Sequence, residues 1–244
     1  MSDNMVSMPI PNSSFQFSAI APEMLENSEY TLFTMIRDKS GSVSPLAQAL
    51  ADMENTAIDA LKLSPRAENL LVRSESFNEV VTEEYGFKPM IDVAHIPAAH
   101  CTGGTALRDA VYAGIGATLQ YADTLRGHAF GSEQINAILI IITDGDDTSS
   151  AISAARIKKV LEEAIQNEKI SSITTILVGI NDQHCKTYLQ QFKDEAGLDQ
   201  FVSMGDATPS KIAKLCGFIS KSVSMKSQSL GNPAVPSQPV NLTF

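Results

Sequence analysis

Residues 137–147 carry the sequence AILIIITDGDD, in which six apolar residues are followed at once by a polar and acidic turn. A run that is apolar at every position has no side suited to water, so it predicts a strand that is buried on both faces. Such strands occur in parallel sheets whose two faces are covered by helices. We therefore expect residues 137–142 to form a central strand of an α/β fold.

Other apolar runs flank this one, and stretches with helical periodicity separate them. Further strands are predicted at 32–36, 70–72, 173–178 and 201–202, with a weaker candidate around Val80 or at 91–93. Helices are predicted around 46–61, 107–121, 157–165, 188–192 and 208–223. This alternation predicts a doubly wound, mostly parallel sheet of about six strands with helices on both faces. Residues 73–96 lack a clear helix, so we expect one antiparallel edge strand there.

The length of 244 residues suits one α/β domain with short additional segments. We expect residues 1–28 to form an N-terminal extension, 29–224 the domain, and 225–244 a disordered tail rich in Ser and Pro. No stretch resembles a signal peptide or reaches the length of a membrane span, so the sequence predicts a cytoplasmic protein without membrane contact.

Charge and reactive side chains exclude several classes of function. The formal net charge of −10 argues against a nucleic-acid partner, which would be held by clustered Lys and Arg side chains. The three cysteines are far apart and form no metal-binding pattern, so inert thiols are expected at Cys101, Cys185 and Cys216. None of the four histidines stands in a known nucleophile motif, and no catalytic residue is assigned.

Oxygen-bearing side chains follow two of the predicted strands and precede one predicted helix. Asp38, Ser40 and Ser42 come after the first strand, Asp144 follows residues 137–142, and Thr105 stands before the second helix. Ligands of open α/β sheets bind beyond the carboxyl ends of the strands, where these side chains are expected to meet. Carboxylates and hydroxyls are suitable ligands for hard divalent cations. The sequence therefore predicts a cation site there.

Three motifs in this order resemble the von Willebrand factor A (vWA) domain family: DKSGS at 38–42, GGTALRDA at 103–110 and ITDG at 142–145. The resemblance extends from about Glu29 to about Ser224 and is strongest to small stand-alone intracellular members of bacterial or phage type. It implies a Rossmann-like vWA fold with a metal-ion-dependent adhesion site (MIDAS). The implied metal is Mg²⁺, or Mn²⁺ or Ca²⁺, and the implied ligands are Asp38, Ser40, Ser42, Thr105 and Asp144.

The resemblance also implies a function. A MIDAS domain is a protein-interaction module without enzymatic activity, whose cation has one position open to an Asp or Glu of a partner. An AAA-type ATPase or a signalling protein is one kind of partner found beside intracellular members. Two alternatives stay open: a Mg²⁺-dependent phosphoester hydrolase using Asp146 or Asp147 as its base, and a structural subunit with a vestigial site.

Two features next to the motifs depart from a plain MIDAS. Arg37 stands directly before Asp38, where the family usually has an apolar or acidic residue. Its side chain either points to the other face of the sheet or neutralises Asp38. Asp146 and Asp147 either hold an auxiliary cation or, as we favour, cap the next helix or remain solvated.

Overall fold

The apolar run at 137–142 lies in the centre of the sheet, in strand β6 (Gln134–Thr143), where every residue after Gln134 is buried. β6 pairs in parallel with β3 (Glu29–Asp38) on one side and β7 (Ser172–Gly179) on the other. The computed structural model describes residues 4–128 and 134–228. The prediction of a central strand buried on both faces is confirmed.

The sheet contains eight strands among the described residues, in the order β1-β2-β5-β4-β3-β6-β7-β8. The remaining strands are β1 (Met5–Pro9), β2 (Gln16–Ile20), β4 (Leu70–Phe77), β5 (Val81–Pro89) and β8 (Gln200–Ser203). β5 pairs antiparallel with β4, and β8 pairs in parallel with β7. The mostly parallel α/β sheet is confirmed.

One detail of the predicted sheet was wrong, because the described residues contain eight strands instead of about six. The antiparallel strand predicted within residues 73–96 is β5, and β2 and β1 extend the sheet beyond it on that side. β1 and β2 are five residues each and mix polar with apolar side chains. Such short segments form strands because they pair with neighbouring strands, so their own sequence pattern does not predict a strand.

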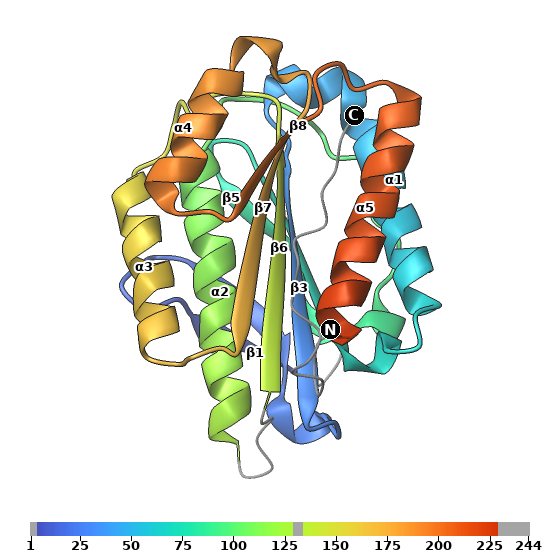
Figure 1. Ribbon diagram of the computed structural model, residues 1–244, viewed down its shortest axis with the longest axis vertical. Helices are drawn as coiled ribbons and strands as arrows, with labels where there is room; N and C mark the ends of the chain where they lie inside the picture. Colours follow the sequence, from blue (N-terminus) through green and yellow to red (C-terminus); the bar gives the residue numbers. More distant parts are fainter. Residues whose placement is uncertain (1–3, 129–133, 229–244) are drawn as a thin grey trace.

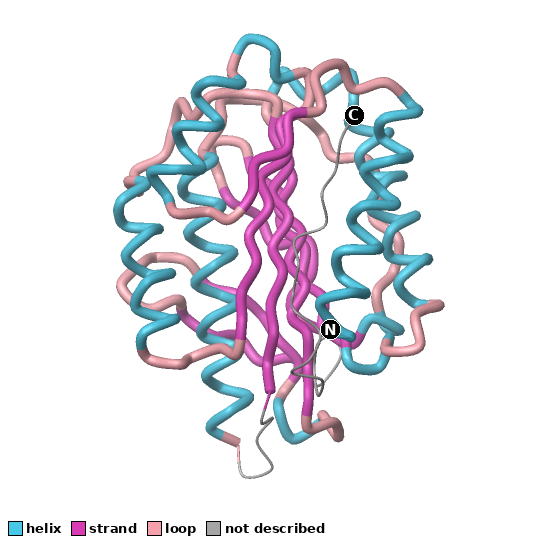
Figure 2. The backbone as a smooth tube through the Cα atoms, in the orientation of Figure 1, coloured by secondary structure: helices cyan, strands magenta, loops and turns pink. Residues whose placement is uncertain are grey.

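Helices cover both faces of the sheet (Figures 1 and 2). One layer contains α2 (Leu107–Gly127), α3 (Ala154–Gln166) and α4 (Lys186–Ala196), and the other contains α1 (Ala47–Lys62) and α5 (Pro209–Gln228). Short 3₁₀ helices in the described part of the chain are η1 (Pro22–Met24), η2 (Gly41–Leu46), η3 (Ala67–Asn69), η4 (Met90–Asp92) and η5 (Asp182–His184). Each layer has its own apolar core against the sheet.

Some described elements lie outside the predicted domain limits. β1 and β2 fall within residues 1–28 and belong to the sheet, and α5 continues beyond Ser224. Residues 225–228 were predicted as disordered tail but are helical, and Lys226 Nζ donates a hydrogen bond to Thr174 Oγ1 at 2.9 Å, which anchors the last turn. Residues 229–244 lie outside the described part of the chain, and the division into domains stays a prediction.

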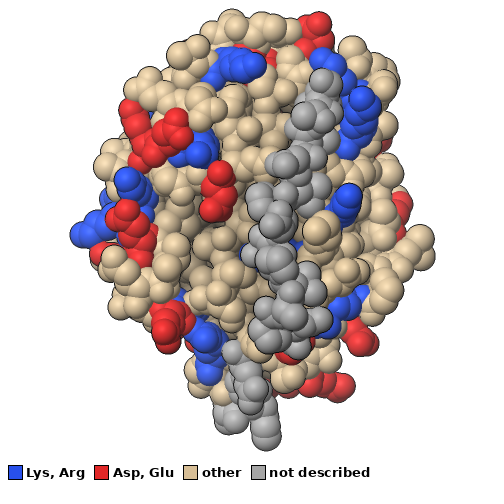
Figure 3. All heavy atoms as spheres, in the orientation of Figure 1, with Lys and Arg blue, Asp and Glu red and all other residues tan. Residues whose placement is uncertain are grey.

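Charged side chains of both signs are interspersed on the face drawn in Figure 3, where no large basic patch is seen. No helix within the described ranges is long and apolar enough to cross a membrane.

Candidate metal site

Asp38 is the last residue of β3, and two hydrogen bonds fix its carboxylate. Oδ1 accepts a hydrogen bond from the backbone N–H of Ser40 at 2.7 Å. Oδ2 accepts one from Thr143 Oγ1, at the end of the neighbouring strand β6, at 2.6 Å. The carboxylate is therefore held at the carboxyl edge of the sheet, the edge at which open α/β sheets bind ligands.

Ser40 and Ser42 connect Asp38 with Asp144. The hydroxyls of Ser40 and Ser42 lie 3.1 Å apart, and Ser42 Oγ donates a hydrogen bond to Asp144 Oδ1 at 2.7 Å. A continuous chain of hydrogen bonds thus joins four of the five predicted ligands, which come from two different strand ends.

Thr105 reaches the same edge because the loop before α2 is hydrogen-bonded to the loop after β3. Gly41 N–H donates to the Gly103 carbonyl at 3.1 Å, and Thr102 N–H donates to the Lys39 carbonyl at 3.0 Å. A Cβ atom built on Gly145 would lie 3.9 Å from Thr105 Oγ1, which places this hydroxyl beside the Asp144 turn. The structure brings all five predicted residues together; their binding of a metal stays a prediction.

The site is rich in buried negative charge. Asp38 and Asp144 are only 3% and 4% exposed. Burial raises the pKa of Asp38 to about 6, against hydrogen bonds from Ser40 and Thr143, and the charge of Asp144 adds to the rise. Burial also raises the pKa of Asp144, opposed by the hydrogen bond from Ser42. The surroundings of both carboxylates therefore supply too little positive charge to offset the cost of burying their negative charge.

A divalent cation fits this deficit. Within residues 4–128 and 134–228, neither carboxylate forms an ion pair with Lys or Arg. The same residues contain no group of three or more His, Cys, Asp or Glu side chains able to hold a metal. A cation held by the five predicted residues would meet two carboxylates and three hydroxyls, an all-oxygen set that suits Mg²⁺ better than a soft metal.

Arg37 does not neutralise Asp38. Its side chain lies on the α1 face of the sheet, where Nε is 2.5 Å from Oε2 of Glu54. Both side chains are almost fully buried, and the pKa of Glu54 is raised by burial in spite of the arginine. The Arg37 side chain therefore points to the other face of the sheet, as the first of the two possibilities predicted, and it leaves the negative charge of Asp38 intact.

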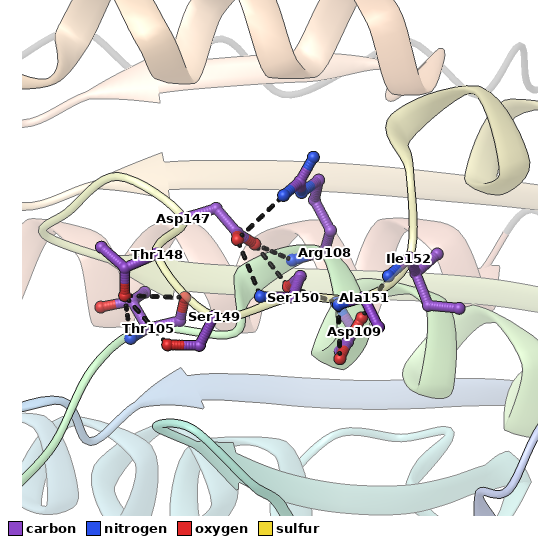
Figure 4. Close-up of polar contacts among 9 residues, drawn as sticks. All are labelled: Thr105, Arg108, Asp109, Asp147, Thr148, Ser149, Ser150, Ala151 and Ile152. Atoms are coloured by element: carbon purple, nitrogen blue, oxygen red, sulfur yellow. Dashed lines mark hydrogen bonds and ion pairs between the residues drawn. The ribbon is translucent and has the colours of Figure 1, made fainter.

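Asp147 ties the turn after β6 to the beginning of α2 (Figure 4). Its Oδ2 accepts from Arg108 N–H at 2.8 Å and from Ser150 Oγ at 2.5 Å, and its Oδ1 accepts from Arg108 Nη2 at 3.1 Å and from Ser150 N–H at 3.0 Å. Burial acts to raise the pKa of Asp147, but these hydrogen bonds outweigh it and lower the pKa. Asp147 thus caps α2, whereas we expected it to cap the next helix, α3, whose cap is Ser153.

Replacing Asp147 with Ala is expected to destabilise the fold by about 1–3 kcal/mol, because two backbone N–H groups lose a charged acceptor in a poorly hydrated place. Urea unfolding measures this change. Asp146→Ala is the matched control, since Asp146 is the exposed neighbour on the same turn and should change stability by less than about 0.5 kcal/mol. Equal stabilities of the two variants would contradict the capping role.

Sequence reasoning missed three residues that hold the site together. Thr143 donates to Asp38, Cys185 Sγ donates to the Asp144 carbonyl at 3.3 Å, and the carbonyl of Asn78 accepts from Ala106 N–H at 2.6 Å. Thr143 offered a signal, because it is the hydroxyl residue directly before Asp144 at a strand end. The other two act through contacts between loops that are distant in sequence, and no local pattern marks them.

No family model matches the chain, and no curated protein matches it in sequence. Solved structures do match its fold. The pilus adhesin SpaC from Lactobacillus rhamnosus GG has a TM-score of 0.58 at 11% identity over 83% of this chain. The PilB minor pilin from Streptococcus sanguinis has a TM-score of 0.58 at 15% identity over 87%. Proximal thread matrix protein 1 from the mussel byssus, with a zinc-occupied MIDAS motif, has a TM-score of 0.50 at 17% identity over 80%. The fold is vWA-like.

The chain spans only part of each of these proteins: 32% of the pilus adhesin, 64% of the minor pilin and 46% of the matrix protein. At such identities the likeness concerns the vWA-like fold alone. In this chain the five oxygen-bearing residues lie at the carboxyl edge of the sheet.

Proposed function

We propose that this protein is a non-enzymatic protein-interaction module of the vWA type that binds Mg²⁺ through Asp38, Ser40, Ser42, Thr105 and Asp144. The observation that carries the proposal is the chain of hydrogen bonds from Asp38 through Ser40 and Ser42 to Asp144. It holds oxygen ligands from separate loops at one edge of the sheet. Mn²⁺ or Ca²⁺ is an alternative occupant with similar ligand preference.

The binding mechanism follows from the charges. Two carboxylates balance a divalent cation, while hydroxyls and water complete its shell without adding charge. An Asp or Glu of a partner would supply a further oxygen ligand to this cation, so partner binding would require both the metal and an acidic residue. A cytoplasmic protein such as an AAA-type ATPase or a signalling protein is the kind of partner proposed, and cell fractionation tests that location.

The structural neighbours support this function over an enzymatic one. Two are a pilus adhesin and a minor pilin, and the matrix protein holds zinc at its MIDAS motif. A hydrolase needs a base beside the metal, and Asp147 is engaged with Arg108 and Ser150. The raised pKa values of Asp38 and Asp144 argue against a vestigial site, because uncompensated buried carboxylates are costly without a cation.

The proposal is tested by recovery of partners from a lysate of the source organism with tagged protein. We expect a band that appears with Mg²⁺, disappears with chelator and is absent with Asp144→Asn, while the exposed control Asp146→Asn retains it. Mutation of the partner's acidic residues should then abolish binding. Equal recovery in all lanes would refute the metal bridge. Turnover of p-nitrophenyl phosphate that is lost in Asp146→Ala would favour the hydrolase instead.

A further inference from the structure

A buried ion pair joins α1 to β3 directly behind the metal site. Arg37 Nε and Glu54 Oε2 are 2.5 Å apart, with side chains 3% and 1% exposed. Glu54 also accepts a hydrogen bond from the hydroxyl of Tyr85, on β5, at 3.2 Å. One carboxylate in the middle of α1 is therefore attached to two strands of the sheet.

Such a pair is not explained by stability. Removing two charges from water is expensive, and apolar side chains of similar volume in the same place are often equally stable or more so. A buried ion pair has one property that apolar contacts lack, because its attraction depends on distance and direction. The apolar residues of α1, such as Leu50, Met53 and Ala57, pack the helix against the sheet, and the ion pair adds a polar contact between α1 and β3.

That position matters for the candidate ligands. α1 follows η2 without interruption, and η2 contains Ser42, whose hydroxyl is bonded to Asp144. At the other end of the ion pair, Arg37 is the residue before Asp38. The pair thus links the helical segment that carries Ser42 to the strand that carries Asp38. Mg²⁺ requires near-ideal octahedral geometry, so a small shift of η2 relative to β3 weakens its binding.

We propose that Arg37 and Glu54 are positioning residues of the metal site: their ion pair fixes α1 and η2 relative to β3, and so fixes the Ser42 hydroxyl relative to Asp38. This inference rests on the proposed function, because it concerns the same cation. Neither residue is among the proposed metal ligands.

The test is the Mg²⁺ affinity of Arg37→Met/Glu54→Leu, measured by calorimetric titration of the full chain with Mg²⁺ alone. The double substitution removes no net charge and retains side-chain volume. We expect affinity to fall about tenfold, the usual effect of removing a group that orients metal ligands. The urea stability of the metal-free protein should stay equal or rise. A purely structural pair would show the reverse, lower stability with unchanged affinity.

The chain offers a matched control in Arg73 and Glu75. This pair is 2.6 Å apart and equally buried, but both residues lie on β4, and Arg73 also pairs with Glu83 of β5, so its ion pairs connect strands and not a helix. Arg73→Met/Glu75→Leu should leave the Mg²⁺ affinity within about twofold of wild type. An equal loss of affinity in both double variants would overturn the inference, because the effect would then belong to any buried charge.

A second variant covers the case in which the first fails to fold. Arg37→Lys keeps the charge but loses the planar Nε contact to Glu54, so Mg²⁺ affinity should fall about threefold or more. Unchanged affinity in the folded variants would overturn the positioning role while leaving the proposed function intact. Absence of Mg²⁺ binding in the wild type would instead refute the proposed function itself.

Discussion

Asp144→Asn is expected to weaken Mg²⁺ binding by about 100-fold or more. The substitution keeps an oxygen that can accept the hydrogen bond of Ser42 but removes one of the two charges that balance the cation. Loss of a supporting residue around a metal already costs about 10- to 100-fold, so loss of a charged ligand belongs at the upper end or beyond. Calorimetric titration with Mg²⁺ measures the affinity.

The stability of the metal-free protein should change in the opposite direction. Burial disfavours the charged form of Asp144, so a neutral amide in its place should leave the metal-free melting temperature unchanged or higher. Asp146→Asn removes the same charge from an exposed position on the same turn and is expected to alter affinity by less than about threefold. Equal affinities of the two variants and wild type would exclude Asp144 as a ligand.

Gly86→Ala is expected to destabilise the protein by about 3 kcal/mol. β2 and β5 approach each other so closely that a Cβ atom on Gly86 would overlap the backbone carbonyl and the hydroxyl of Ser18. The ladder between these strands has one register pair, Ala19 with Phe87, and is reinforced by Ser18 N–H and Oγ donating to Glu83. Overpacking of this kind typically costs about 1–3 kcal/mol, and backbone atoms yield less easily than side chains.

Urea unfolding measures that loss, and hydrogen exchange of β1 and β2 should show that the added methyl group separates these strands from the rest of the sheet. The matched control is Gly217→Ala on the exposed side of α5, where a Cβ atom meets nothing within 4 Å. There the better helix propensity of Ala should stabilise the protein by up to about 1 kcal/mol. A neutral Gly86→Ala would show that β2 and β5 are not in close contact.

Strong local patterns predicted most of the central fold. Residues 137–142 are apolar throughout, which is enough to predict a strand with helices on both sides. The helical periodicity at 208–223 predicted α5, which begins at Pro209 in the structure, where Ile212 N–H donates to the Thr208 carbonyl at 2.9 Å. β1 and β2 were not predicted because contacts with distant parts of the chain stabilise them. Tyr121 of α2, for example, donates its hydroxyl hydrogen to the Ile20 carbonyl at 2.8 Å.

The residue types at the candidate site, and the strand ends that carry them, were evident from the chain, because they depend only on local order along the sequence. The partners of neighbouring charged residues were not. Arg37 pairs with Glu54 instead of Asp38, and Asp147 caps the helix that precedes it in sequence instead of the one that follows. The partners of Arg37 and Asp147 depend on which segments pack against each other, because a buried charge is stabilised by the oppositely charged or polar group that the tertiary structure places beside it.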